Sequence, residues 1–452
     1  MKIVMKRISF FALTFICSAC ILSCNDKDEV KDMAADEQRS FLEDVAVEFT
    51  QKVPASDFEE LKSFAEDISY IFDDYSWSTV GDTLASDFYK SMQTFEESYV
   101  DSLTYPGRYF YGYEEYTVMI LALSNFTGHF TAKDGGWVYT ESKDLQFDFK
   151  DANKKACVLK IAQEGKVTEL ALPEIEDEDI DEEGDEIFYD YESTSIVIGV
   201  PEKIIVSLSQ EGKDMIKATF TPTITNLSED GYFDIGKTNI LMGAELALGN
   251  GYNASFKTEE SPNKKISVSF DLSNKTGNLF SYTLSGDPSG IPSYVLEYMA
   301  DLDGLGDTIQ NSEDLNTKNI YMSYSVLGKV QVIGRITDYK ELMSLTELLY
   351  ENSENEAKYK KNIADLNSLI DLGLYYNGSQ KKQADLEFEA QLRSDTHGGK
   401  TEEWWEGIPV MVFTDGARIS CEDFFDEKGF TKAIEAFDAL EAQYDAMFEG
   451  EE

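Results

Sequence analysis

The sequence predicts an α+β fold, with a helical N-terminal part, a large antiparallel β-sheet in the middle, and a mixed C-terminal part that packs onto the sheet and ends in a helix. Apolar residues follow a helical period over residues 37–127, alternate with polar residues over 128–337, and show both periods over 338–452. Hydrophobic residues make up 42% of the 452 residues and aromatic residues 13%. This composition excludes a largely disordered chain, because so much apolar surface can fill large cores.

Residues 1–23 are typical of a leader that is removed. A basic head of two lysines and one arginine precedes an apolar run that is too short to span a bilayer. The run ends in Ile21-Leu22-Ser23-Cys24, which resembles the lipobox of bacterial lipoproteins, where an aliphatic pair and a small residue precede the acylated cysteine. The resemblance implies cleavage before Cys24 and attachment of acyl chains, such as palmitate, to its thiol. The alternative is a buried N-terminal helix.

Residues 24–36 form an acidic tether. Within it, Asn25-Asp26-Lys27-Asp28-Glu29 resembles the export signal that follows the lipidated cysteine in Bacteroidota surface lipoproteins. The resemblance implies a protein that is anchored in the outer membrane and faces the cell exterior, with the acyl chains as its only membrane contact. A flexible acidic spacer without a sorting role would have the same composition.

Residues 37–127 carry three apolar stripes at helical spacing. The first helix is expected to end at Pro54, and Ser56 with Glu59 forms a capping box that would start the second. The stripes are Phe41, Val45 and Phe49, then Phe58, Leu61, Ala65, Ile68 and Phe72, then Leu84, Phe88, Met92, Phe95 and Tyr99. We expect these helices to pack on one another or on a sheet.

Residues 128–337 alternate in the manner of antiparallel strands with one buried face. Asn250-Gly251 between two alternating runs predicts a tight hairpin turn. A long strand is expected to start at Ile320, with Gly328 as a bulge inside it. Between residues 174 and 186 there are ten acids and no base, so the acidic loop 174–193 is expected to leave the sheet and remain in water.

Residues 338–452 mix both periods. Thr337-Asp338 opens a predicted helix, and Ser353 with Glu356 forms a capping box for the next one. Asn377-Gly378 predicts a turn into an alternating run. The last predicted element is an amphipathic helix whose apolar stripe is Ile434, Phe437, Leu440 and Tyr444.

Three stretches are similar to segments that recur in a group of uncharacterised Bacteroidota lipoproteins. They are LSNFTGHF at residues 123–130, VLGKVQV at 326–332 and VFTDG at 412–416. The resemblance would cover most of the chain after Cys24, and it implies no activity. Gly128 and Gly328 are expected to serve the backbone within these stretches.

The chain is strongly acidic. Its formal net charge is −47, and loss of the leader removes three bases and no acids, which gives −50. This charge excludes nucleic acid as a favoured partner and disfavours an anionic membrane surface. It is compatible with cations or basic partners, and equally with a solvated acidic shell that has no specific role.

The sequence offers no catalytic signature. HExxH, GxSxG, GxGxxG and the P-loop pattern are all absent, and His129 and His397 are the only histidines. Cys421 could form a thiolate pair with His397, or it could be a small buried residue, which we favour. Carboxylates are too numerous for any two to be identified as a catalytic dyad. We therefore expect neither an enzyme nor a cofactor.

A metal site is not expected either. Asp301, Asp303 and Asp307 resemble part of a calcium loop, but Leu305 and Ser312 stand where an EF-hand needs an oxygen donor and a bidentate glutamate. We favour a polar glycine turn there. The acidic run 174–186 could hold cations diffusely.

Two aromatic stretches could form a binding surface. Residues 105–116 are rich in tyrosine, and Trp404-Trp405 is a second such place. Exposed aromatic rings can stack on sugars or anchor a protein partner, whereas the alternative is that they fill the junction between helices and sheet.

The sequence thus favours a lipid-anchored envelope protein that binds an extracellular glycan, a peptide or an envelope protein. Two alternatives remain open, a carboxylate-dependent hydrolase of extracellular polymers and a structural envelope component without a ligand. Whether Cys157 and Cys421 form a disulfide is also open, because two cysteines do not define a disulfide framework.

Overall fold

The computed structural model describes residues 32–80, 127–172, 179–180, 186–187, 196–225, 239–260, 266–286, 318–397 and 400–448. Several predicted features lie outside these residues. They are the leader 1–23, Cys24, the acidic signal Asn25 to Glu29, the third helical stripe Leu84 to Tyr99, the aromatic stretch 105–116 and the calcium-like loop 301–307.

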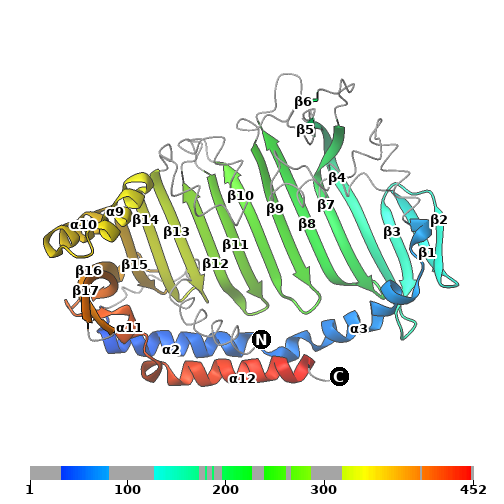
Figure 1. The fold of residues 1–452 in the computed structure, drawn as a ribbon. Helices are drawn as coiled ribbons and strands as arrows, with labels where there is room; N and C mark the ends of the chain where they lie inside the picture. Colours follow the sequence, from blue (N-terminus) through cyan, green and yellow to red (C-terminus); the bar gives the residue numbers. More distant parts are fainter. Residues whose placement is uncertain are drawn as a thin grey trace. The chain divides into compact units, whose positions relative to one another are not determined.

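Sixteen strands form one open, mixed sheet in the order β18-β17-β16-β15-β14-β13-β12-β11-β10-β9-β8-β7-β4-β3-β1-β2 (Figure 1). This corrects the predicted fold class in two respects. The C-terminal strands continue the sheet instead of packing onto it, and the sheet is mixed because β1 (Gly128–Lys133) runs parallel to β3 (Leu145–Lys150). Alternation along a strand shows which side chains share a face, but it does not show which neighbour the strand joins, so the sequence pattern could not reveal either feature.

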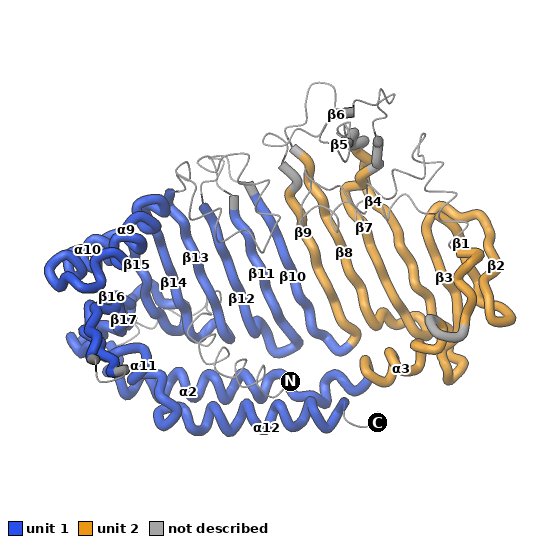
Figure 2. The backbone as a smooth tube through the Cα atoms, in the orientation of Figure 1, with its two compact units in different colours: residues 1–60, 250–292, 310–452 blue, residues 61–249, 293–309 orange. Residues whose placement is uncertain are grey.

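The chain divides into two compact units that draw on distant parts of the sequence (Figure 2). Unit 1 comprises Met1–Glu60, Asn250–Pro292 and Gln310–Glu452, and unit 2 comprises Leu61–Gly249 and Ser293–Ile309. The division at residues 249 and 250 falls inside the stretch that alternates with period two.

In unit 1 the strand neighbours within the described residues pair antiparallel. The strands are β10 (Asn253–Glu260), β11 (Ile266–Asn274), β12 (Gly277–Gly286), β13 (Lys318–Val326), β14 (Val330–Asp338), β15 (Ile370–Tyr376), β16 (Lys382–His397), β17 (Lys400–Phe413) and β18 (Arg418–Ser420).

Gly328 lies in a hairpin turn between β13 and β14, and the long strand with a bulge that the sequence predicted is wrong. Val326 pairs with Val330, which leaves a three-residue turn between them. Leu327 and Gly328 take φ values of +55° and +64°. A left-handed backbone at successive positions reverses the chain with a twist that matches the strands, and glycine adopts it at no steric cost.

The core of unit 1 lies between the sheet and helix α2 (Ala35–Lys52), which also packs with the C-terminal helix α12 (Thr431–Phe448). Leu42, Val45 and Ala46 of α2 are buried against apolar side chains of β13 to β17. Phe437 of α12 lies 6.5 Å from Phe49, measured between ring centroids. The predicted C-terminal helix is therefore confirmed, with its apolar stripe facing another helix.

Two further helices, α9 (Tyr339–Glu351) and α10 (Glu356–Leu369), separate β14 from β15. Asp338 caps α9 as predicted, because its side chain accepts a hydrogen bond from the Glu341 amide. The predicted capping box of α10 is displaced by two residues, since Asn355 and not Ser353 accepts from Lys358. Leu345, Leu366 and Leu369 form the small buried cluster between the two helices.

The predicted capping box of Ser56 and Glu59 does not start the second helix. Ser56 lies inside the 3₁₀ turn Ala55–Phe58, which follows Pro54, and helix α3 (Glu59–Asp74) begins at the glutamate. Two residue types at the right spacing mark the neighbourhood of a helix start, but neighbouring residues decide which of them forms the cap.

Unit 2 contains β1, β3 and the strands β2 (Gly136–Thr140), β4 (Ala156–Leu172), β7 (Ile196–Gln210), β8 (Lys213–Thr225) and β9 (Asn239–Leu248). Its core lies between α3 and the β1–β4 end of the sheet, where Phe64, Ile68 and Ile71 bury against Phe130 and Phe147. From the acidic loop, β5 (Asp179–Ile180) and β6 (Glu186–Ile187) pair with each other as a separate two-stranded ladder.

Among the described residues, no helix is both long and apolar enough to cross a membrane.

Candidate binding surface on the β16–β17 ribbon

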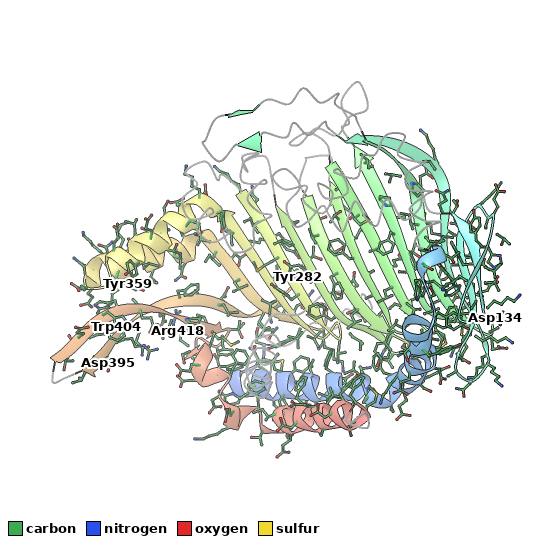
Figure 3. All side chains as sticks on the ribbon, turned by 45° about the vertical axis from the view of Figure 1, so that its right-hand side comes forward. Asp134, Tyr282, Tyr359, Asp395, Trp404 and Arg418 are labelled. Carbon is green, nitrogen blue, oxygen red and sulfur yellow. The ribbon has the colours of Figure 1, made fainter. Side chains whose placement is uncertain are left out.

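The hairpin of β16 and β17 extends beyond its neighbours as a two-stranded ribbon. Its two strands stay in register from Ala384 paired with Phe413 to His397 paired with Lys400. Strand β15 pairs with β16 only as far as Leu386, and β18 pairs with β17 only over Val410–Val412. The remainder, residues 387–397 and 400–409, is hereafter called the ribbon (Figures 1 and 3).

Helices α9 and α10 support the ribbon through both packing and backbone hydrogen bonds. The Asn367 side chain accepts from the Phe388 amide and donates to the Phe388 carbonyl, each at 2.8 Å, and thus pairs with the edge of β16 as a strand would. The Trp405 amide donates to the Ser353 carbonyl at 2.7 Å on the edge of β17. These bonds occupy edge groups that an isolated ribbon would leave to solvent or to another chain.

Gly407 allows α10 to approach the ribbon closely. A Cβ atom at this position would lie 2.9 Å from Ile363 Cδ1. Tyr359 and Ile363 of α10 are buried, and burial raises the pKa of the Tyr359 hydroxyl above its ordinary value. A two-stranded hairpin is marginal in water by itself, so this packing is what fixes the ribbon.

Trp404 and Trp405 lie on opposite faces of the ribbon, because consecutive strand residues alternate. Trp405 shares the α10 face with Leu392, its direct partner, and the Lys360 ammonium lies 4.6 Å from the centroid of the Trp405 ring. Trp404 lies opposite Arg393 on the other face, and Arg393 forms an ion pair of 2.8 Å with Glu406. Figure 3 shows Trp404 and Asp395 on the ribbon and Tyr359 on the helix pair above it.

Exposed apolar side chains gather on the ribbon and on the end of α9. Of the ten large hydrophobic side chains that are exposed in the described residues, four lie here: Leu348, Tyr350, Leu392 and Trp404, with exposed fractions of 41%, 86%, 48% and 38%. Tyr350 precedes the turn whose Ser353 carbonyl binds Trp405. Leu392 shares the α10 face with Trp405, whereas Trp404 is the exposed aromatic side chain of the opposite face. An exposed aromatic side chain on a supported strand pair is typical of an interaction site.

The sequence identified only part of this surface. The sequence predicted that Trp404-Trp405 could belong to a binding surface. In the structure Trp404 is exposed, whereas α10 partly covers Trp405. Leu392 was expected only as a strand residue, and Tyr350 was missed. An aromatic residue that follows the last buried position of a helix stripe is the signal that could have indicated Tyr350.

Acidic residues dominate the face that carries Trp404. Asp395 and Glu402 stand at directly paired positions, two residues from Arg393 and Trp404 respectively. Nearer the base of the hairpin, Arg418 binds Glu387 at 2.8 Å and also Glu389, and these carboxylates raise the pKa of its guanidinium.

The two histidines belong to different units. His129 lies on β1 in unit 2, where its Nε2 is 2.7 Å from Asp148 Oδ2 and Gln146 donates to the other carboxylate oxygen at 2.7 Å. His397 ends β16 in unit 1.

The two described cysteines are free thiols, which resolves the disulfide alternative. Cys421 begins the short helix α11 (Cys421–Phe424) and packs against the core of unit 1, where burial raises the pKa of its thiol to about 11. At neutral pH it is therefore protonated, which disfavours a nucleophilic role with His397. In the described parts of the chain, no three histidine, cysteine or acidic side chains are grouped in a way that could hold a metal ion.

Comparisons with protein-family models, curated proteins and solved structures found no match to this chain.

Proposed function

We propose that the protein is a lipid-anchored envelope protein that binds an extracellular ligand or an envelope partner through the Trp404 face of the ribbon. The observation that carries this proposal is the exposed indole of Trp404 on a ribbon whose opposite face is held by α10. A binding surface needs such a rigid support, because an aromatic side chain that is already ordered loses little entropy when a ligand covers it.

The lipid anchor is supported by the sequence alone. Cys24 stands at the end of the lipobox-like motif, and the acidic residues that follow it resemble an export signal. Several acyl chains on one cysteine would give a stable tether, since each buried methylene contributes about 0.8 kcal/mol. The folded units then need no lipid contact of their own.

The binding role is tested with the purified protein lacking residues 1–23 on arrays of defined glycans and peptides. Trp404→Ala should abolish or strongly weaken the signals that the wild type gives. Val138→Ala is the matched control, because Val138 is also an exposed apolar side chain, with a fraction of 47%, but lies on β2 in unit 2. Signals that survive Trp404→Ala unchanged, or that both variants lose equally, would contradict a site on the ribbon.

A further inference from the structure

An exposed indole and an ion pair lie beside each other on one face of the ribbon. Arg393 stands directly opposite Trp404, and Gln391 stands opposite Glu406, so alternation places all four side chains on the same face. Arg393 Nε donates to Glu406 Oε2 at 2.8 Å, and the two side chains of this pair remain 40% and 50% exposed. The face therefore presents an apolar ring next to charged groups that a ligand in solution can reach.

The ion pair keeps hydrogen-bonding capacity toward solvent. A guanidinium has five N–H donors, and a carboxylate accepts through two oxygens. Of these groups, only Arg393 Nε and Glu406 Oε2 are hydrogen-bonded to another described side chain. Directly paired strand residues have Cβ atoms about 5 Å apart, so a ligand that covers the Trp404 ring also reaches the remaining donors of Arg393.

The charges around Trp404 disfavour a charged ligand of either sign. Arg393 faces the indole directly and repels a cation that is placed over the ring. Glu402 and Glu406, two residues away along the same strand, repel an anionic group. Charge complementarity therefore favours a neutral ligand, and the Arg393–Glu406 pair favours one whose groups both donate and accept hydrogen bonds.

Resting on the proposed binding role of the ribbon, we propose that the ligand of the Trp404 face is a neutral glycan. One pyranose ring stacks on the indole, and its neighbouring hydroxyls bind Arg393 and Glu406. The C–H face of a sugar ring is apolar and covers an aromatic ring, while each hydroxyl can accept from a guanidinium and donate to a carboxylate.

The neighbours of Trp404 distinguish a glycan from a protein partner. The core of a protein–protein interface is depleted of charged residues, and an aromatic anchor there lies among other apolar side chains. Around Trp404 the positions along and across the strands are instead charged, since they are Glu402, Glu406 and Arg393. A sugar ring needs only one aromatic ring together with polar partners at its edge, which is what this face provides.

The experiment is isothermal calorimetry of the protein lacking residues 1–23 with cellohexaose, maltohexaose, mannohexaose and xylohexaose as neutral probes. Hexagalacturonic acid and an arginine hexapeptide are the charged probes. The variants are Trp404→Leu, Trp404→Tyr, which keeps a ring, and Glu406→Ala. The matched control is Glu403→Ala, which makes the same change on the opposite face, where Glu403 pairs with Ser394. Far-ultraviolet circular dichroism and the melting temperature establish that each variant is folded.

At least one neutral probe should bind, with an affinity that does not change between about 0.05 M and about 0.5 M ionic strength, because screening acts only on charges. Trp404→Leu should weaken this binding about tenfold and Glu406→Ala about threefold, whereas Trp404→Tyr and Glu403→Ala should stay within about twofold of the wild type. Equal affinities of Glu406→Ala and Glu403→Ala would overturn the assignment of the sugar hydroxyls to the ion pair.

Two further outcomes separate this proposal from the binding role on which it rests. If only a charged probe binds, and it loses affinity in Trp404→Leu, the ligand class proposed here is wrong while the binding role of the ribbon stands. If no probe binds in a manner that depends on Trp404, both proposals are wrong.

Discussion

Tyr376 and Gln38 lie 338 residues apart in the sequence and are joined by a hydrogen bond of 2.8 Å, in which the Tyr376 hydroxyl donates to Gln38 Oε1. Both side chains are fully buried in the core of unit 1. The Gln38 amide nitrogen in turn donates to the carbonyls of Met33 and Gln383, each at 2.9 Å. This polar network fixes α2 at one position on β15 and β16, within a core whose other contacts are apolar and less directional.

Tyr376→Phe should destabilise unit 1 by about 1–3 kcal/mol, because the buried side-chain oxygen of Gln38 (Oε1) loses the hydroxyl that donates to it. Urea unfolding followed by circular dichroism measures the change. Tyr350→Phe is the control, since Tyr350 is 86% exposed and the same substitution there should change the free energy of unfolding by less than about 0.5 kcal/mol. Equal effects at the two tyrosines would show that the network contributes nothing.

The sequence predicted helices and strands better than the contacts between them. The apolar stripe that contains Val45 correctly indicated α2. The sequence alone would assign Gln38 to a solvent-facing position, because its hydrogen-bond partner Tyr376 lies far along the chain. In α3 the stripe shifts: Phe64, Ile68 and Ile71 are buried, whereas the expected Ala65 is exposed. A helix can rotate by one position to suit the sheet it covers, and that choice is made by the tertiary structure.

The candidate surface was predictable only in part for a similar reason. Two consecutive tryptophans in an alternating run must point to opposite faces, so the sequence could indicate that one is more exposed than the other. Which of them is covered depends on α10, which crosses the ribbon because Gly407 leaves room for Ile363. That contact joins residues from separate elements, and no local pattern records it.

Cys24→Ala should abolish lipid attachment, because the thiol is the acyl acceptor that the lipobox resemblance implies. Metabolic labelling with a fatty-acid analogue checks this. The protein should lose the label and keep its leader, whereas Cys421→Ala should be labelled as the wild type is. Undiminished labelling of Cys24→Ala would show that the motif is not a lipobox.

Replacement of the acidic loop 174–193 by a short Gly/Ser link should leave the fold intact. Strands β4 and β7 already pair with each other up to Leu172 and Ile196, and β5 and β6 pair outside the large sheet. We therefore expect the loop to contribute little to the stability of the large sheet. The closure entropy of a surface loop also depends weakly on its length. We expect the melting temperature to shift by about 3 °C or less, with a gain at low salt as self-repulsion is relieved.

Scanning calorimetry with and without calcium checks the loop replacement. A collapse in stability would show that the loop is part of the structure. A melting temperature that calcium raises in the wild type and not in the variant would identify the acidic run as a structural cation site, contrary to its expected solvated role.

Stability should decline in alkali because the pKa values of two thiols are raised, that of the buried Cys157 and that of the half-buried Cys421. Burial, with a smaller contribution from the Asp151 carboxylate, raises the pKa of Cys157 from 9.0 to about 11, and burial raises that of Cys421 to the same value. Above pH 9 the unfolded chain releases these protons while the folded state keeps them. The unfolded state then binds fewer protons, so the free energy of unfolding falls as the pH rises from about 9 to about 11, by roughly 1–3 kcal/mol for each thiol.

Urea unfolding at a series of pH values separates the thiols from other groups. Cys157→Ala and Cys421→Ala should each remove part of the decline between about pH 9 and 10, and the double variant most of it, while all curves run parallel below about pH 8. Burial raises the pKa of Tyr252 to about 12, so this tyrosine lowers stability only from its ordinary value of 10.0 upward. A decline that begins near pH 10 and is as steep in the double variant as in the wild type would assign it to tyrosine ionisation, and the thiols would have no part in it.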